Sequence, residues 1–144
     1  MNFIGANILS VDQFNLDDVN TLFSVAEKMQ PYATREKVTK VLDGAVLGNI
    51  FLESSTRTRV SFGSAFNLLG GDVRETSDVS SSAFVKGESV RDAARILSGY
   101  SDVICIRHPK SGSVKEFADF SRVPVINGGD GSNEHPTQAL LDLF

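Results

Sequence analysis

Residues 51–59 read Phe-Leu-Glu-Ser-Ser-Thr-Arg-Thr-Arg, and they join two segments with different patterns of apolar residues. The apolar run 46–52 is typical of a buried strand, whereas the spacing that follows predicts a helix over 56–69, ended by Gly70-Gly71. We expect this helix to bury one apolar face, which consists of Val60, Ala65, Leu68 and Leu69.

The polar turn between this strand and this helix is suited to binding an anion. Backbone N–H groups and the positive end of the helix dipole meet at such a turn. Arg57 adds a planar guanidinium that can hold two phosphate oxygens. Further donors come from Ser55, Thr56 and Thr58. The turn alone leaves an alternative open, in which a hydroxyl side chain caps the helix and the arginines are solvated.

The composition is that of one ordinary globular domain. The chain has 144 residues, of which 41% are hydrophobic and 22% are charged, and this is enough for a real core. Its net charge of −4 argues against general binding to nucleic acid, which needs a basic face, but leaves room for a local basic pocket. No change in composition marks a second domain.

The single cysteine and the lengths of the apolar runs indicate in which cellular compartment the protein is expected. Cys105 has no partner for an internal disulfide, which fits a reducing environment. The first residues lack the basic and apolar regions of a signal peptide, and no apolar run approaches membrane-spanning length. We therefore expect a cytoplasmic protein that does not contact a membrane.

Two helices are expected upstream of the central strand. A capping box at 10–13 predicts a short helix, and Asn15 should cap a longer one that Pro31 ends. The apolar stripe of the longer helix is expected to lie in the core, and it comprises Leu16, Val19, Leu22, Phe23, Ala26 and Met29.

Strands and helices alternate downstream. A capping box of Ser113 and Glu116 should start one helix, and Pro136 fits the first position of another. The strand expected at 72–76 is short and polar, which favours a place near a sheet edge, and a long serine-rich loop follows at 77–87. The remaining strands are expected at 102–107 and 123–127, and the remaining helices at 88–99, 113–120 and 136–144.

This alternation predicts an α/β fold with a four-stranded parallel sheet flanked by helices, doubly wound, Rossmann-like and forming a single domain. Ligands of such sheets bind beyond the carboxyl ends of the strands. Every candidate site residue lies there: Ser55 to Thr58, Ser82 and Lys86, Arg107, and His135 and Gln138 follow the four strands in turn.

Each candidate also has a simpler interpretation. Arg107 could be paired on the surface at a strand end, and His135 could bond a nearby carbonyl at a helix start. Lys86-Gly87 could be an ordinary loop sequence that precedes a helix. The convergence of all of them on one edge of the sheet favours a site.

Several common sites are absent from the sequence. Cys105 and His108 have metal-like spacing, but residues three apart on a strand point to opposite faces and no second ligand pair exists, so we expect no metal. Neither G-x-G-x-x-G nor G-x-x-x-x-G-K-[ST] occurs, and there is no G-x-S-x-G nucleophile pattern.

Four motifs together resemble the carbamoyl-phosphate-binding domain of the aspartate/ornithine carbamoyltransferases. They are Ser55-Thr-Arg-Thr-Arg59, Lys86-Gly-Glu88, Arg107-His-Pro109 and Gly129-Asp-Gly-Ser-Asn-Glu-His-Pro-Thr-Gln138. The run from Gly129 to Phe144 looks like the aspartate branch. Chains of the family continue into a second domain that binds the amino acid. The resemblance therefore implies that residues 1–144 are the N-terminal half, without that second domain.

The resemblance also implies a role for each site residue. The phosphate would lie in the backbone nest of Ser55, Thr56, Arg57 and Thr58, held by the side chains of Arg57 and Arg107. Thr58, Arg107 and His135 would donate to the carbamoyl oxygen, and Gln138 would orient the carbamoyl NH₂. Metals and organic cofactors have no part in this chemistry. The residues implied to be catalytic are Arg57, Thr58, Lys86, Arg107, His135 and Gln138.

The implied activity is transfer of the carbamoyl group from carbamoyl phosphate to L-aspartate, giving N-carbamoyl-L-aspartate and phosphate in de novo pyrimidine biosynthesis. Ser82 and Lys86 would act in a neighbouring site of a homotrimer. Glu53 would pair with arginines of the second domain, and L-aspartate would bind only with that domain. The 144 residues alone should therefore be inactive.

Two alternative interpretations stay open at this point. An ornithine or other carbamoyltransferase is one, because the amine-binding half would decide. A non-catalytic module for anion binding or oligomerisation is another. A regulatory subunit is a further partner that the sequence neither requires nor excludes.

Overall fold

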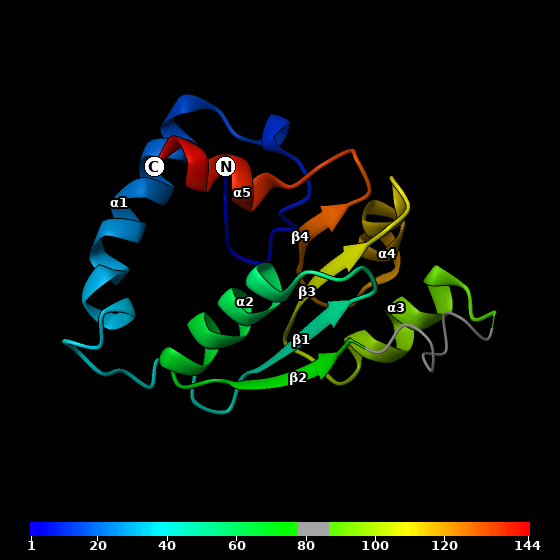
Figure 1. Ribbon diagram of the computed structural model, residues 1–144, viewed down its shortest axis with the longest axis horizontal. Helices are drawn as coiled ribbons and strands as arrows, with labels where there is room; N and C mark the ends of the chain where they lie inside the picture. Colours follow the sequence, from blue (N-terminus) through cyan, green and yellow to red (C-terminus); the bar gives the residue numbers. More distant parts are fainter. Residues whose placement is uncertain (78–86) are drawn as a thin grey trace.

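The computed structural model describes residues 1–77 and 87–144, and they contain one four-stranded parallel sheet flanked by helices (Figure 1). Its strands lie in the order β2-β1-β3-β4, and each neighbouring pair is parallel. The predicted α/β class is confirmed, and so is the edge position of the second strand. The bounds are β1 (Val46–Phe51), β2 (Asp72–Thr76), β3 (Val103–His108) and β4 (Val125–Asp130).

The helices begin where the sequence offers capping groups. Ser10 forms a capping box with Gln13, and Asn15 forms one with Asp18, as the predicted starts require. Pro136 takes the first position of the last helix, where its missing N–H costs nothing. The described helices are η1 (Val11–Gln13), α1 (Leu16–Ala33), α2 (Thr56–Leu68), α3 (Val90–Ser98), α4 (Ser113–Phe120) and α5 (Pro136–Leu143).

One face of the sheet is covered by α3 and α4. On α3, Ala93 and Ala94 are buried, and Val90 and Leu97 pack against the same cluster. Phe117 of α4 is fully buried at the centre of this face. The sheet contributes Ile50, Leu52, Ile104, Ile106 and Val125 to the same cluster.

The opposite face of the sheet is covered by α2. The predicted buried face of α2 is wrong for Val60 and Ala65, which are exposed, whereas Leu68 and Leu69 are half-buried. The residues that pack on the sheet are Phe62 and Phe66. Gly63 lies between them and is the one buried residue of α2. The fully buried residues of this second cluster are Leu47, Phe51 and Cys105.

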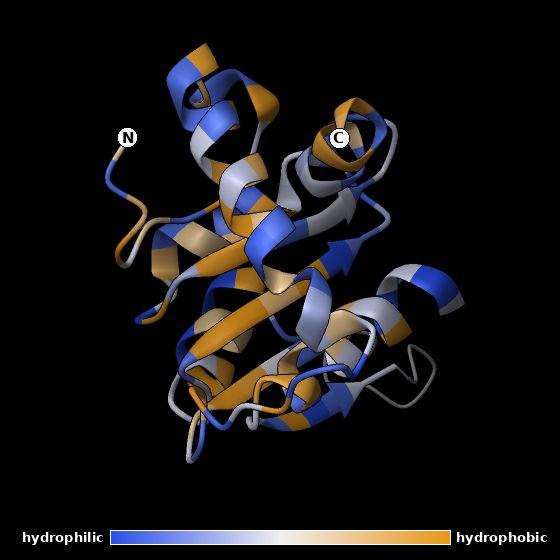
Figure 2. Cartoon of the chain, turned by 90° about the vertical axis from the view of Figure 1, so that its left-hand side faces the viewer, coloured by the Kyte–Doolittle hydropathy of each residue, from blue (hydrophilic) through white to orange (hydrophobic). Residues whose placement is uncertain are grey.

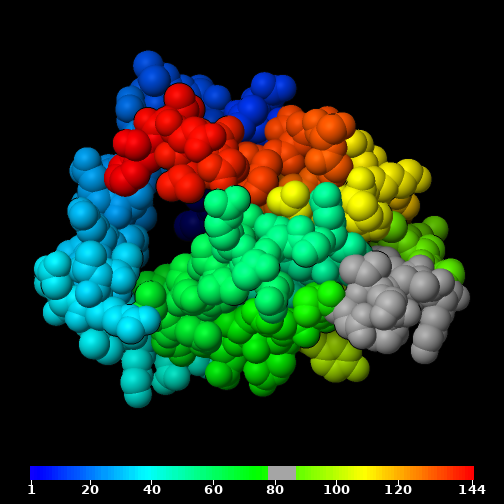
Figure 3. All heavy atoms as spheres, viewed as in Figure 1, coloured from blue at the N-terminus to red at the C-terminus, as the bar shows by residue number. Residues whose placement is uncertain are grey.

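Two predictions for α1 are also wrong. Pro31 does not end the helix, which continues to Ala33, because the ring restricts only the turn before it and Thr34 N still donates to Gln30 O at 2.9 Å. The apolar stripe is not core. Leu16, Ala26 and Met29 are exposed, and Asp18 is the one buried residue of α1. Figure 3 shows a hollow between α1 and the rest of the molecule.

Two further differences from the prediction concern the end of β4 and the cap of α4. The strand runs from Val125 to Asp130, past the expected end at 127, with a register shift opposite β3. The capping box of Ser113 and Glu116 is absent, because Gly112, at φ +84°, is the N-cap and Ser113 is already helical. Since Gly112 N donates to the Asp130 carboxylate at 2.9 Å, the two differences share one contact.

The N-terminal segment runs beside the outer edge of β4. Ile8 N donates to Val125 O at 2.8 Å, and Asn127 N donates to Ile8 O at 2.8 Å. None of the described helices is long and apolar enough to cross a membrane.

Candidate functional site

A cavity of about 610 Å³ opens at the carboxyl ends of the strands. The structure brings six of the predicted residues together around it, from α2, from the end of β3 and from α5. They are Ser55, Arg57, Thr58, Arg107, His135 and Gln138, joined by Ser61 and Leu141. The convergence expected at this edge of the sheet is therefore present in three dimensions.

Three predicted residues are not part of this lining. Thr56 lines a neighbouring cavity of about 250 Å³ with Glu53 and Arg59, so its side chain does not face the first cavity. Ser82 and Lys86 lie outside the described residues.

The first wall of the cavity is the start of α2. The helix begins at Thr56 after Ser55, whose backbone is extended with φ −157° and ψ 94°. Ser55 makes no side-chain capping bond, so the alternative in which this hydroxyl caps the helix is not what the structure has. The first amides of a helix have no acceptor inside it, and here they lie beside Arg57 at the cavity.

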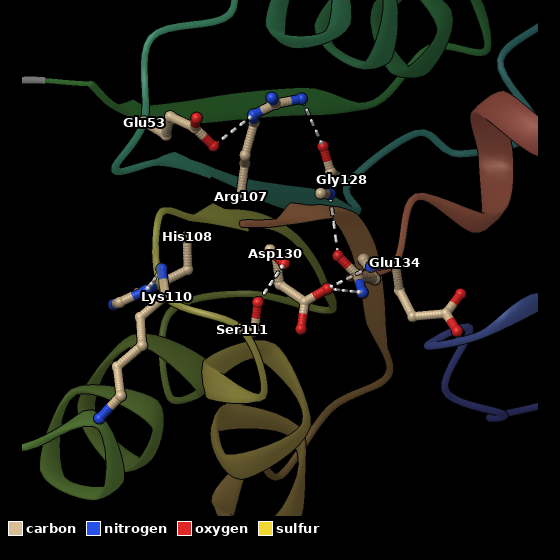
Figure 4. Close-up of polar contacts among 10 residues, drawn as sticks. Glu53, Arg107, His108, Lys110, Ser111, Gly128, Asp130 and Glu134 are labelled. Atoms are coloured by element: carbon tan, nitrogen blue, oxygen red, sulfur yellow. Dashed lines mark hydrogen bonds and ion pairs between the residues drawn. The ribbon is translucent and has the colours of Figure 1, made fainter. Parts of the chain in front are cut away.

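Arg107 forms the floor between the walls, and its guanidinium is held at two points (Figure 4). Its Nε donates to Glu53 Oε2 at 3.1 Å, and its Nη1 donates to Gly128 O at 3.3 Å. The side chain is 20% exposed. Gly129 lies against the guanidinium, where a Cβ would come 2.9 Å from Nη1. Arg107 is therefore positioned by its surroundings and does not extend into solvent.

The charge of the cavity is opposite to that of the chain. Arg57 and Arg107 both line it, and none of its lining residues is acidic. The net charge of the whole chain is −4. Two guanidiniums beside a helix N-terminus form a local anion site on an acidic protein.

The second wall is the start of α5, where His135 is the N-cap residue. Burial, followed by the positive charge of Arg107, lowers the pKa of His135, and the Asp142 carboxylate opposes this in part. The imidazole is therefore neutral at pH 7 and can donate a hydrogen bond without adding charge. Its Nδ1 lies 3.4 Å from Thr137 Oγ1.

Gln138 lies one turn further along α5. Its Nε2 donates to Asp142 Oδ1 at 2.8 Å, which makes Oε1 the amide atom suited to accept a bond from a ligand. The site thus combines two cations, one neutral imidazole and one amide acceptor. This set can hold a dianion at one end and polarise a carbonyl group at the other.

Comparison with known protein families shows to which of them this chain is related. A family model described as "Aspartate/ornithine carbamoyltransferase, carbamoyl-P binding domain" matches residues 6–144. The chain belongs to this family.

Relatives within the carbamoyltransferase family are close along the whole chain. It is 69% identical over all 144 residues to the aspartate carbamoyltransferase catalytic subunits of Cellvibrio japonicus and Saccharophagus degradans, and covers 43% of each. It superposes with a TM-score of 0.89 and 39% identity on aspartate transcarbamoylase from Trypanosoma cruzi in complex with carbamoyl phosphate and aspartate. That match covers 96% of this chain and 46% of the other. The chain spans less than half the length of these carbamoyltransferases.

Sequence reasoning missed two residues that line the cavity and one that lies beside it. Ser61 lies three positions after Thr58, and Leu141 lies three positions after Gln138, so helical spacing could have indicated both. Thr137, beside His135, lines an adjoining cavity of about 330 Å³ that continues toward Phe62. The anion site therefore has an apolar pocket next to it.

No cluster of three or more His, Cys, Asp or Glu side chains that could hold a metal ion occurs in residues 1–77 and 87–144.

Proposed function

We propose that residues 1–144 are the carbamoyl-phosphate-binding domain of an aspartate carbamoyltransferase. The observation that carries this proposal is the cavity in which Arg57, Arg107 and His135 meet at the carboxyl edge of the sheet. The close relatives named as aspartate carbamoyltransferases support the choice of L-aspartate as acceptor. L-Aspartate itself would be held by a second domain, which these 144 residues do not include.

The phosphate of the substrate occupies the start of α2 in this proposal. Its oxygens accept hydrogen bonds from the backbone of Ser55, Thr56, Arg57 and Thr58. The side chains of Arg57 and Arg107 then supply charge-assisted bonds, which are roughly twice as strong as neutral ones. Thr56 takes part through its backbone, which agrees with its side chain lining the neighbouring cavity.

The carbamoyl group occupies the space between Arg107 and α5. Thr58, Arg107 and His135 donate to its oxygen, and Gln138 accepts from its NH₂ group. The amine of aspartate attacks the carbamoyl carbon, a C–N bond forms, and negative charge develops on that oxygen. The C–O bond to phosphate then breaks, phosphate leaves with the electron pair, and the amine loses a proton. Donors placed at the oxygen stabilise the tetrahedral state.

The chain is proposed to work as a homotrimer in the cytoplasm. Ser82 and Lys86 of one subunit would complete the site of the next, with Lys86 as a catalytic residue. In the longer protein, mixing an Arg57→Ala chain with a Lys86→Ala chain should restore part of the activity. Some hybrid sites then draw both intact residues from different chains. Hybrids that form without any recovery would contradict this arrangement. A regulatory subunit would be a further partner.

Calorimetric titration of the 144-residue chain tests the site directly. Carbamoyl phosphate and inorganic phosphate should both bind, and Arg57→Ala should weaken both by about 1.5–3 kcal/mol, as expected for lost bonds to a charged group. His135→Ala should weaken carbamoyl phosphate alone, since His135 is assigned to the carbamoyl oxygen. Arg122→Ala is the matched control, because it removes an exposed arginine outside the cavity.

Two outcomes would overturn the assignment. Affinity of Arg57→Ala within a factor of two of wild type would remove the phosphate from this helix start. Equal losses of both ligands in His135→Ala would remove the carbamoyl group from His135.

Turnover tests the division of labour between the two domains. The 144 residues alone should carbamoylate aspartate at a negligible rate, because holding the amine in line contributes roughly 7–11 kcal/mol of barrier lowering. A steady-state rate above background in a sample free of host enzyme would contradict this. In the longer protein, turnover of ornithine in preference to aspartate would show that the acceptor is wrong.

A further inference from the structure

Asp130, the last residue of β4, is a buried carboxylate outside the cavity. It is 2% exposed, and the residues lining the cavity do not include it. A buried charge is costly unless its oxygens are satisfied. The sequence motif contains Asp130, but the chemistry assigned to the site leaves it without a role.

All the hydrogen bonds that the structure gives this carboxylate come from N–H groups. Oδ2 accepts from Gly112 N at 2.9 Å and from Asn133 Nδ2 at 3.3 Å. Oδ1 accepts from Glu134 N at 2.9 Å and from Asn127 Nδ2 at 3.4 Å. Burial by itself would raise the pKa of the Asp130 carboxyl, but these hydrogen bonds outweigh it and lower the pKa.

These bonds join three parts of the fold. Gly112 is the N-cap of α4, where the helix dipole favours a negative charge. Asn127 belongs to β4, and Glu134 is the residue directly before His135. The carboxylate therefore links α4 and β4 to the backbone that carries His135 into the cavity.

The turn from Asp130 to Glu134 is also closed by its own backbone. Asp130 N donates to Glu134 O at 3.1 Å, and Asn133 N donates to Asp130 O at 3.1 Å. The turn is tied to β3 as well, since Gly131 N donates to His108 O at 2.9 Å. Figure 4 shows the group around Asp130 beside the bonds that hold Arg107.

We propose that Asp130 is a positioning residue, which fixes the turn 130–134 and thereby sets the place of His135 and Gln138 against the substrate. The ligand-binding test of this role rests on the proposed function. Asp130 acts through the backbone and does not touch the substrate. A carboxylate serves here because four donors converge on it, two on each oxygen, and an amide in its place would point an NH₂ group at two of them.

Asp130→Asn tests the proposal, because it keeps the size of the side chain. The carbamoyl phosphate dissociation constant should rise about tenfold or more, whereas that of inorganic phosphate should change less than threefold, since the start of α2 is untouched. A purely structural role would instead lower both affinities together with stability. Equal losses for the two ligands, or no loss, would overturn the proposal.

Glu134→Gln is the matched control. It removes a negative charge from the same turn, but the Glu134 carboxylate points away from Asp130 (Figure 4). Its Oε1 accepts a hydrogen bond from Ser10 Oγ at 2.9 Å. Affinity for carbamoyl phosphate should stay within twofold of wild type. A loss as large as that of Asp130→Asn would assign the effect to charge in the turn and overturn the role of Asp130.

Two further measurements keep the test decisive. If Asp130→Asn does not fold, Asn133→Ala removes one donor to the carboxylate and should weaken carbamoyl phosphate by a smaller factor, again without changing phosphate. The ring NMR signals of His135, assigned by comparison with His135→Asn, should shift in the ligand-free variant. They report positioning even if the chain binds no carbamoyl phosphate, so the two proposals fail separately. Unchanged ring signals in a folded variant would overturn the role of Asp130.

Discussion

The two faces of the sheet differ in how completely their side chains are buried. On the face of α3 and α4, three strands and two helices contribute buried side chains, and those of Phe117 and Ile104 are fully buried. On the face of α2, Phe62 and Phe66 are only partly buried over a small cluster. Two apolar residues at the C-terminus stay exposed, Leu143 at 70% and Phe144 at 61%. Figure 2 shows the apolar residues of this C-terminal helix in orange.

The difference shows where stability and binding are located. α3 and α4 contribute no lining residue to the cavity, whereas α2 and α5 supply most of it. The well-packed face holds β1, β3 and β4 in place, and the site residues follow their carboxyl ends. The less buried helices can therefore adjust around a ligand without opening the larger core.

Phe117→Ala should have the largest effect on this comparison. Removing a fully buried ring costs about 3–5 kcal/mol of the free energy of unfolding, because it loses apolar contact and leaves a cavity. Phe66→Ala on the other face should cost clearly less, since Phe66 is only partly buried. Urea unfolding of both variants measures the two losses. Equal losses would mean that the two faces contribute alike.

Gly129→Ala should have the next largest effect, and it should act on the site as well as on stability. The residue has φ +123°, which strains any other side chain by about 1–3 kcal/mol, and its Cβ would meet the Arg107 guanidinium. We expect lower stability together with weaker phosphate binding, measured by urea unfolding and calorimetry.

Gly44→Ala separates the two causes. Gly44 also has a positive φ, +83°, but a Cβ there would meet nothing within 4 Å. It should lose stability without losing phosphate affinity. If both variants lose affinity equally, displacement of Arg107 is not the reason.

Glu53→Gln should have a smaller effect in the opposite direction. Glu53 accepts from Arg107 Nε, so removing its charge frees the guanidinium for phosphate. The affinity should rise by about 0.2–1 kcal/mol, the usual range for a partly exposed pair. Glu75→Gln is the control, because Glu75 pairs with Arg59 away from the cavity, and calorimetry should find its phosphate affinity unchanged. A weaker complex in Glu53→Gln would show that the pair prepares Arg107 for binding.

The smallest effect concerns pH. The folded protein lowers the pKa of His135 below its ordinary value of 6.5, so the unfolded chain takes up a proton first as the pH falls. This contribution to stability is present above pH 6.5 and is lost as the pH falls through the folded pKa. The urea midpoint should fall from pH 7.5 to pH 5.5, and less so in His135→Asn. An equal fall in both would assign the effect to other groups.

The alternation of strands and helices could be predicted because each element carries its own pattern. The convergence of Arg57, Arg107 and His135 followed from the rule that parallel strands end at one edge. The buried face of α2 could not be predicted, since the helix carries two apolar faces that compete, and only the structure shows that Phe62 and Phe66 pack on the sheet.

The contacts of Asp130 were equally out of reach. Gly112 lies 18 positions away in the sequence, and nothing in the local pattern pairs the two residues. The same bond placed the true N-cap of α4 at Gly112, where the sequence favoured a capping box at Ser113. Long-range contacts of this kind determine how a site is supported, whereas local patterns determine where it lies.

The chain's only thiol, Cys105, lies in the inner strand β3 and is completely buried. Burial raises the pKa of this thiol, so the native protein should hardly react with iodoacetamide. Alkylation of Cys105 therefore requires that β3 first separates from its neighbouring strands, and the alkylation rate reports how often this opening occurs. A ligand bound at the carboxyl end of β3 should lower the alkylation rate in proportion to the fraction of sites that it occupies. One unmodified cysteine thus gives a chemical readout of occupancy without any label.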